Sequence, residues 1–272
     1  MADRNGGSVA ARGAELLGDR VAEGFAEIGR VTLLVGDMLR VVVRRLPAGR
    51  LLIQQMQAIG VDSLWLVIVV SLFTGGVAAV QAAYQFSNVV PLKYIGSVIL
   101  RSVVIELGPV LTALVVGGRV GASIAAELGT MKVTEQIDAL SAMGIDPVRF
   151  LIVPRVTAAI IMLPIITIYA DAIVVFGGYI VSVTSIGVST HTYVTALHDF
   201  FYLRDVISGL IKAFFFGGII GTMGCYSGFR TEGGAEGVGR ATTNAVVWSC
   251  VLVLILDYLL ANFLFRIIFA KR

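Results

Sequence analysis

Five apolar stretches, each long enough to cross a bilayer as a helix, constrain this sequence more than any other feature. A hydrocarbon core of roughly 30 Å requires about 20 apolar residues per helix. The stretches cover residues 64–83, 98–118, 156–181, 206–226 and 244–265. Helices are expected because a membrane β-barrel would alternate apolar and polar residues. The sequence, 57% hydrophobic and 14% charged, therefore predicts an all-α integral membrane protein with five transmembrane helices.

Outside these runs the chain divides into three segments. Residues 1–29 are polar and glycine-rich, residues 30–63 carry interfacial and connecting helices, and residues 64–266 form the five-helix domain. In the second segment an apolar stripe faces a set of arginines, namely Val31, Leu34, Val35, Met38 and Val42 opposite Arg30, Arg40, Arg44 and Arg45. We expect an amphipathic helix in the membrane interface, or alternatively one packed on a soluble partner.

Glycines and prolines inside the runs predict how the helices pack. Paired glycines recur in four runs, at Gly75-Gly76, Gly117-Gly118, Gly177-Gly178 and Gly217-Gly218. Small residues let helix backbones approach closely. Pro109 and Pro164 lie inside two runs and should kink them. The sequence thus predicts closely packed, bent helices.

The distribution of Lys and Arg predicts the orientation. Residues 1–63 carry eight arginines, whereas 119–155 carry four basic residues and 227–243 carry two. The opposite loops carry mainly Lys93 and Arg204. Positive residues favour the cytoplasmic side, so we expect a cytoplasmic N-terminus and a periplasmic C-terminus, although the short C-terminal tail is itself basic. No apolar core with a cleavage site occurs near the start, so we expect no cleaved signal peptide.

A charged amphipathic island at residues 127–149 separates the second and third runs. It predicts a short cytoplasmic helix over 130–143 that begins at Gly129-Thr130 and ends at Met143-Gly144, with Asp146-Pro147 capping the next helix. One face carries Val133, Ile137, Leu140 and Gly144, and the other carries Met131, Glu135, Asp138 and Ala142. The first face can pack while the second contacts a partner.

Four of the ionisable residues inside the apolar runs are candidates for function, because a charge there costs at least about 2.5 to 3.5 kcal/mol. They are Glu106, Asp171, Lys212 and Asp257. At about 1.5 Å of rise per residue, all four lie at a similar depth in the outer half of the membrane. This layer predicts either ion pairs, such as Lys212 with Asp257 or Asp171, or a cavity for a polar headgroup. Glu106 lies two residues before Gly108-Pro109, where a helix distortion would open the backbone.

Missing motifs narrow the function. The sequence has no phosphate-binding loop, no zinc-protease helix and no nucleophile elbow, so we expect no catalytic residue, no metal site and no cofactor in this chain. Cys225 and Cys250 lie in apolar runs without disulfide or metal spacing, which indicates free thiols. The net charge of +3 follows from the loop arginines and lysines and does not indicate nucleic-acid binding.

Several long motifs together resemble one family. They are Glu106-Leu107-Gly108-Pro109, Gly118-Arg119-Val120-Gly121-Ala122-Ser123, Ala126-Glu127-Leu128-Gly129-Thr130-Met131, Glu135-Gln136-Ile137-Asp138-Ala139-Leu140, Met143-Gly144-Ile145-Asp146-Pro147, Pro154-Arg155 and Gly237-Val238-Gly239-Arg240-Ala241-Thr242-Thr243. In these motifs the chain is similar to the permeases of MCE-type lipid ABC transporters, the MlaE/YrbE family. The resemblance covers about residues 40–265.

The resemblance implies a multi-pass permease in the inner membrane of a Gram-negative bacterium. Its implied partners are a second copy of the chain, an ABC ATPase dimer that holds ATP and Mg²⁺, a hexameric periplasmic MCE-domain protein and, in some members, a STAS-domain protein. The implied substrate is phospholipid or a related lipid, and flow in either direction is compatible with the sequence. The cytoplasmic helix would couple to the ATPase through Glu127, Met131, Glu135, Asp138 and Met143.

The same resemblance implies a lipid pocket at the dimer interface, between the first two spans and toward the periplasm. Its expected lining is Ala78, Gln85, Phe86, Val89, Ile105 and Glu106. Some members carry a basic residue immediately before the motif glutamate, whereas this chain has Ile105. A headgroup contact made by that base would be missing here.

Two other functions fit parts of the sequence. Glu106 could bind the proton of a secondary transporter, although five spans do not divide into two inverted halves. Asp171 and Asp257 could form the carboxylate pair of an intramembrane aspartyl enzyme, although the sequence motifs of such enzymes are absent.

Overall fold

The computed structural model describes residues 49–86 and 94–266, together with positions 26, 29, 30, 32–34, 36, 38 and 40. The chain separates into two compact units, Met1–Leu46 and Pro47–Arg272. The described positions of the first unit are helical, as expected for an N-terminal helix, and most of the predicted 1–29 segment lies outside the described residues. Everything below concerns the second unit.

Five helical stretches among the described residues are long and apolar enough to cross a membrane. They are Gly49–Gln85, Ile95–Val133, Val148–Thr184, Leu203–Phe229 and Gly234–Leu264. Each contains one of the five predicted runs, so the all-α fold with five spans is confirmed. The first begins 15 residues before the predicted start at residue 64, because the amphipathic helix α2 (Gly49–Ile59) precedes α3 (Leu64–Phe86) with only the short turn η1 (Val61–Ser63) between them.

The second span is built from five segments and the third from two. The second consists of α4 (Ile95–Ser102), the π-helical turn η3 (Val103–Leu107), α5 (Gly108–Val116), the π-helical turn η4 (Gly117–Gly121) and α6 (Ala122–Val133). The third consists of the π-helical turn η5 (Val148–Ile152) and α8 (Val153–Thr184). Pro109 lacks an N–H group and so removes the α-helical donor to the carbonyl of Ile105, which accounts for the distortion at η3.

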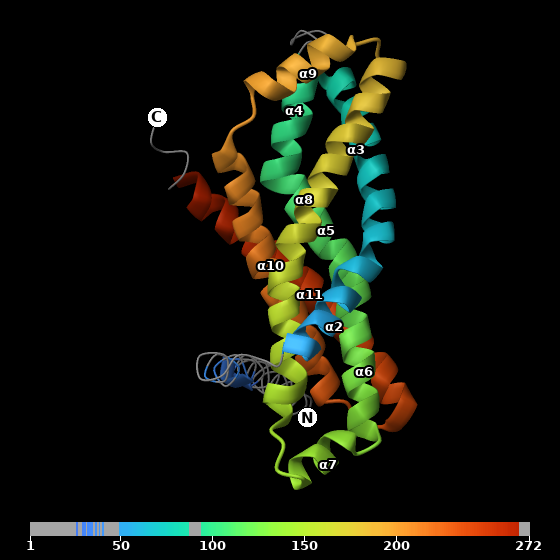
Figure 1. Cartoon of the computed structure of the whole chain (residues 1–272), viewed down its shortest axis with the longest axis vertical. Helices are drawn as coiled ribbons and strands as arrows, with labels where there is room; N and C mark the ends of the chain where they lie inside the picture. Colours follow the sequence, from blue (N-terminus) through green and yellow to red (C-terminus); the bar gives the residue numbers. More distant parts are fainter. Residues whose placement is uncertain are drawn as a thin grey trace, which may run out of the picture. The chain divides into compact units, whose positions relative to one another are not determined.

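Three further elements complete the unit, together with the short helix α7 (Gln136–Ala142). They are α9 (Thr190–Asp199), α10 (Leu203–Phe229) and α11 (Gly234–Leu264). Figure 1 shows α7 at one end of the bundle and α9 at the other, with α8 running between them. The long helix α8 packs against α2, α3 and α10, so it forms the centre of the bundle.

Close helix crossings occur where the paired glycines predict them. A Cβ atom at Gly75 would overlap the carbonyl of Val174, and one at Gly177 would overlap the carbonyl of Leu72, so α3 and α8 touch backbone to backbone. At Gly217 of α10 a Cβ atom would likewise overlap the carbonyl of Ala159. These contacts require glycine because any side chain would push the helices apart.

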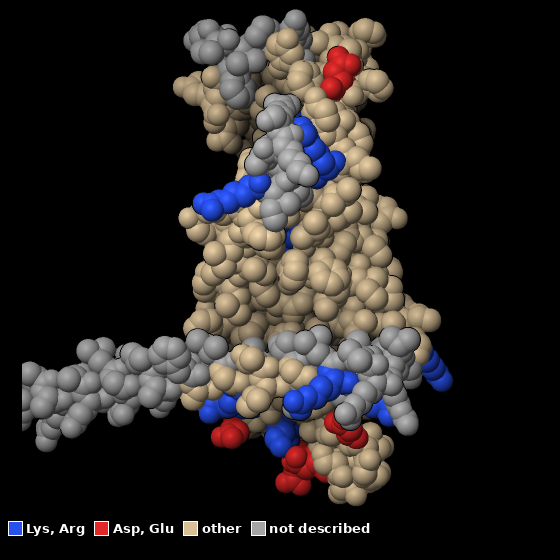
Figure 2. All heavy atoms as spheres, turned by 90° about the vertical axis from the view of Figure 1, so that its left-hand side faces the viewer, with Lys and Arg blue, Asp and Glu red and all other residues tan. Residues whose placement is uncertain are grey.

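The outer surface of the bundle matches a lipid environment. Large apolar side chains are exposed along the spans, among them Phe73, Tyr169, Phe214, Ile255 and Tyr258. Figure 2 shows a broad band almost free of charged side chains, with charged residues gathered at the α7 end and a smaller group toward the α9 end. This is the distribution expected of a membrane-spanning bundle.

The island at residues 127–149 differs from its prediction. The helix expected over 130–143 is two helices, because α6 continues to Val133 and α7 begins only at Gln136. Glu135 between them has a left-handed backbone with φ of 59°. Gly129 does not begin a helix, since it lies inside α6 against Thr231, where a Cβ atom would be 2.7 Å from Oγ1.

The predicted end of the island is correct. Helix α7 ends at Ala142 and is followed by Gly144, whose φ of 76° favours glycine. The Oδ1 atom of Asp146 accepts a hydrogen bond from the backbone N–H of Val148 at 3.0 Å, so Asp146 caps the following helical turn as predicted.

Candidate functional site

A buried ion cluster joins three of the five spans. The Nζ atom of Lys212 lies 2.5 Å from Oε2 of Glu106 and 2.9 Å from Oδ1 of Asp257. Lys212 comes from α10, Glu106 from η3 and Asp257 from α11. The lysine side chain is 1% exposed, so its charge is compensated by carboxylates rather than by water. Of the two pairs suggested for Lys212, the structure contains the one with Asp257 and adds Glu106.

Asp171, the fourth residue of the predicted polar layer, lies apart from this cluster. It belongs to α8, where its Oδ1 atom faces Gly108 so closely that a Cβ atom there would overlap it. This buried oxygen has no hydrogen-bond partner among the described residues. The suggested pair of Lys212 with Asp171 is therefore wrong, and the carboxyl pair of Asp171 and Asp257 needed by an aspartyl enzyme is not formed within the described residues.

A groove of about 600 Å³ opens beside the ion cluster. Its lining comes from the second span, the loop before α10 and the end of α11, and consists of Ser97, Val98, Arg101, Ser102, Ile105, Glu106, Phe200, Ala261 and Phe265. The wall is mostly apolar, whereas Arg101 and Glu106 bring charge to it. Such a surface can hold the apolar body of an amphiphile together with its polar group.

The structure brings together only two of the six residues expected in the lipid pocket. Ile105 and Glu106 line the groove, whereas Ala78 is half-buried on α3 and Gln85 is exposed near its end. Phe86 is the last residue of α3, and Val89 lies outside the described residues. The groove is thus bounded by the second and fifth spans, and the pocket predicted between the first two spans at the dimer interface stays a prediction.

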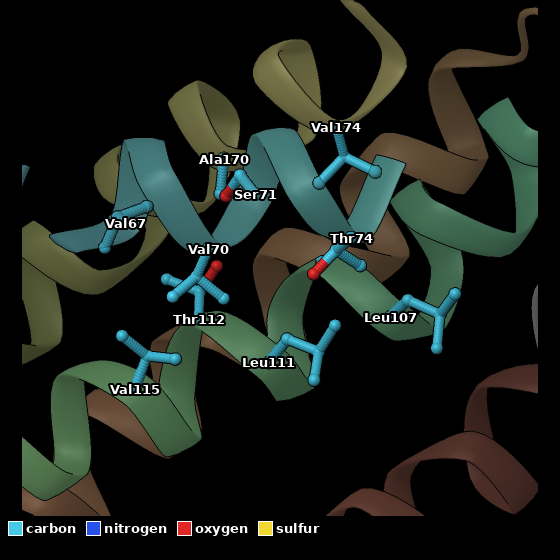
Figure 3. A pocket seen from close by; sticks show the side chains of 11 residues that line it. Val67, Val70, Ser71, Thr74, Leu107, Leu111, Thr112, Val115, Ala170 and Val174 are labelled. Carbon is cyan, nitrogen blue, oxygen red and sulfur yellow. The ribbon is translucent and has the colours of Figure 1, made fainter. Parts of the chain in front are cut away.

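A much smaller void lies between the first, second and third spans. A void of about 10 Å³ remains between α3, α5 and α8, which is room for about one water molecule. Figure 3 shows the side chains of Val67, Val70, Thr112 and Val115 close around it. The void is too small for a lipid chain.

Sequence reasoning missed Arg101, which lines the groove. Its Nε atom donates to Oδ2 of Asp205 at 3.1 Å, and its guanidinium lies 5.7 Å from the centre of the Tyr202 ring. Arg204 approaches the same ring at 4.9 Å. Arg101 falls inside the predicted run 98–118, so the search for ionisable residues in the runs could have found it.

The α7 end carries the expected coupling residues in varied settings. Glu127 is exposed, and its carboxylate also pairs with the buried guanidinium of Arg155 at 2.7 Å. Asp138 binds Nζ of Lys132 at 2.9 Å. Glu135 is exposed and Met131 is half-buried. Of the two methionines among these residues, Met143 is the more accessible, with 67% of its surface exposed.

An accessible surface surrounds these residues. Ile145 and Phe150 are both exposed near Met143, and Ile137 anchors α7 by its own burial. Apolar side chains exposed beside charged groups favour contact with a protein rather than with lipid tails. The α7 end therefore has the composition of a docking surface. The sequence predicted only some of the residues that form it.

Comparisons with known proteins bear on both regions. The family model for the permease MlaE matches residues 52–263. A probable ABC transporter permease of Rickettsia typhi is 47% identical over 217 residues, covering 80% of this chain and 84% of that protein. The Haemophilus influenzae permease MlaE of an intermembrane phospholipid transport system is 33% identical over 250 residues, covering 92% and 96%. The chloroplast protein trigalactosyldiacylglycerol 1 of Arabidopsis thaliana is 35% identical over 236 residues, covering 87% and 67%.

Proposed function

This chain belongs to the MlaE permease family, and on that basis we propose that it moves phospholipid between membranes as the permease subunit of an ABC transporter. The groove beside the Lys212 cluster carries the proposal. It combines an apolar wall with charged groups inside the part of the bundle that spans the membrane. A phospholipid has the same division into an apolar body and a charged head.

The chain contributes a lipid path and no chemistry of its own. An ABC permease works with an ATPase, so the energy for transport comes from ATP hydrolysed in a separate subunit. We place that subunit, as a dimer that binds ATP and Mg²⁺, at the α7 end. Exposed Met143, Glu135 and Asp138 would contact it there.

The second span offers a direct route from the ATPase to the lipid. It runs from Arg101 and Glu106 at the groove to Val133, directly before the break at Glu135. A displacement of α7 would therefore act on the same span that carries the groove. The π-helical turns η3 and η4 are points within this span where the hydrogen-bond pattern already departs from the α-helix.

The remaining assembly follows from the family. The α7 end faces the cytoplasm of a Gram-negative bacterium, in agreement with the basic loops at that end, and two copies of the chain form the membrane domain. A hexameric MCE-domain protein receives or delivers lipid at the α9 end, and a STAS-domain protein binds the ATPase in some systems. These partners belong to the proposal, whereas family membership is its premise.

Coupling at the α7 end can be tested by charge reversal. Reconstituted with its ATPase in liposomes, the chain should support ATP turnover that responds to lipid. Glu135→Lys and Asp138→Lys each replace a negative charge on the exposed docking surface by a positive one. Each should reduce that response about tenfold, equivalent to about 1.4 kcal/mol. Asp199→Lys makes the same charge change on α9, at the far end of the bundle, and should have no effect. A normal response in both α7 variants would contradict docking there.

A further inference from the structure

Charged residues at the groove form two groups. Arg101 in the groove wall and Arg204 both approach the carboxylate of Asp205, at 3.1 Å and 3.7 Å. Lys212, which lies outside the groove lining, faces the two carboxylates of Glu106 and Asp257, so this group has an excess of negative charge when both are ionised. The groove lining itself thus carries one cation, Arg101, and one carboxylate, Glu106.

One residue of each group is accessible to a ligand. The Arg101 side chain is 38% exposed, and its inner Nε atom donates to Asp205, a bond that does not use the two terminal nitrogen atoms. The Glu106 side chain is 39% exposed, and only its Oε2 atom is bound by Lys212. Both residues line the same groove.

The π-helical turn explains how two residues five positions apart share one face. In an α-helix, positions three and four apart lie above each other, whereas π-helical hydrogen bonds join positions five apart. The turn η3 covers Val103–Leu107, so it begins two residues after Arg101 and contains Glu106. It rotates Glu106 toward the face that Arg101 occupies.

We propose that this groove selects zwitterionic phospholipids, with the phosphate bound by Arg101 and the headgroup ammonium bound by Glu106. The inference rests on the proposed function, since it assigns the headgroup class that the permease carries. Arginine suits this role because its planar guanidinium can donate two parallel hydrogen bonds to a phosphate. An ammonium at Glu106 would balance the excess negative charge of the Lys212 cluster.

Asp205 is a positioning residue in this arrangement. Its side chain is 4% exposed, and its carboxylate accepts a hydrogen bond from the guanidinium of Arg101. Arg204 and the Tyr202 ring flank the same site, so the guanidinium is restricted on several sides. A restricted arginine loses less freedom on binding than one on an open surface.

Lipid binding to the purified full-length chain in detergent micelles tests the proposal. A fluorescent phospholipid is displaced by phosphatidylethanolamine, phosphatidylglycerol or diacylglycerol, all with the same acyl chains. The wild-type chain should bind phosphatidylethanolamine most tightly and diacylglycerol most weakly. Arg101→Gln should weaken both phospholipids about tenfold and leave diacylglycerol unchanged, because only the phosphate contact is lost.

Glu106→Gln separates the two halves of the headgroup. It removes the partner of the ammonium, so phosphatidylethanolamine should lose its advantage over phosphatidylglycerol while both still bind more tightly than diacylglycerol. Arg101→Lys keeps the charge without the two-pronged geometry and should fall between the wild type and Arg101→Gln. Arg149→Gln, an exposed change near the α7 end, is the matched control and should bind all three lipids normally.

Loss of Arg101 could unfold the chain, because Asp205 would lose one partner. The double variant Arg101→Gln with Asp205→Asn removes the charge as well, and it should fold and show the same loss of phospholipid binding. If folded variants at Arg101 bind both phospholipids as tightly as the wild type does, the inference is wrong while the proposed function stands. If the wild type binds no lipid at all, the proposed function itself fails.

A soluble competitor distinguishes a lipid from a free phosphate ester. Phosphoethanolamine carries the same two charges without acyl chains, so it should displace the fluorescent lipid at least a hundredfold less well than phosphatidylethanolamine, because Ile105, Phe200 and Phe265 would find no apolar partner. Equal displacement by the two would contradict a lipid ligand.

Discussion

The two ends of the second span hold ion pairs of similar length in very different surroundings. Lys212 lies 2.5 Å from Glu106 and is 1% exposed, whereas Lys132 lies 2.9 Å from Asp138 with side chains 33% and 60% exposed. A buried charge that loses its partner remains without water, but an exposed one is hydrated again at once. The buried cluster therefore fixes the structure, and the exposed pair leaves the α7 end free to bind a partner.

Removal of the buried lysine should have the largest effect on stability. Lys212→Met leaves two carboxylates together without a cation and should destabilise the chain by about 3 to 5 kcal/mol. Thermal unfolding in detergent, monitored by size-exclusion chromatography, measures the loss of stability. Adding Glu106→Gln and Asp257→Asn to the same chain should restore most of it, and a stable single variant would remove the distinction between the two ends.

Arg155 provides an intermediate case. Its guanidinium is buried and donates to the carbonyl of Leu151 at 2.8 Å, but its partner Glu127 is half exposed. We expect Arg155→Met to cost about 1 to 3 kcal/mol in the same assay, less than Lys212→Met, because water can hydrate the remaining carboxylate. Glu127→Gln keeps the shape and one acceptor and is the control, with a smaller expected loss. A loss from Arg155→Met as large as that of Lys212→Met would show that burial of one partner alone decides the effect.

The exposed pair should contribute little to stability. Lys132→Ala should change the free energy of unfolding by about 0 to 1 kcal/mol, since solvent screens the attraction between Lys132 and Asp138. The same thermal measurement checks this, with Lys132→Arg as the charge-conserving control. A loss of several kcal/mol would mean that α7 belongs to the rigid core and is not an adaptable surface.

A pH-dependent effect is expected at the α9 end. Tyr193 is buried, its hydroxyl donates to the carbonyl of Val175 at 3.0 Å, and burial raises the pKa of Tyr193 to about 12 from 10.0. The neutral form is favoured in the fold, so its contribution to stability is complete below pH 10 and is lost as the pH rises toward 12.

Tyr193→Phe should cost about 0.5 to 1.5 kcal/mol at neutral pH. Between pH 10 and 12 it should lose less stability than the wild type, because it has no hydroxyl to ionise. If the two chains lost the same stability with rising pH over that range, the raised pKa of Tyr193 would be contradicted.

Hydropathy was sufficient to predict the five spans, because each apolar run must be buried in lipid or protein whatever its neighbours are. The break at Glu135 could not be predicted in this way. The helical pattern of the island continues through it, and the left-handed backbone depends on how α6 and α7 pack. Gly129 illustrates the same limit, since it resembles a helix start in the sequence but serves a close contact with Thr231.

The candidate site was predictable in its residue types and less so in its partners. Charges inside apolar runs identified Glu106, Lys212 and Asp257, which meet in the structure, but nothing in the sequence separated Asp171 from them. Which helices are neighbours is a property of the fold. Arg101 was overlooked near the start of its run, where a charged side chain is ordinarily able to reach the membrane surface.

Blocking the groove tests the central claim most directly. Ile105→Trp places a bulky ring in the groove, and Ile255→Trp makes the same change on the exposed face of α11. In liposomes that contain the chain and its ATPase, we measure ATP-dependent transfer of labelled phospholipid to an acceptor. We predict that Ile105→Trp abolishes transfer while Ile255→Trp and the wild type transfer lipid equally. Transfer by Ile105→Trp at the wild-type rate would contradict the groove as the lipid path.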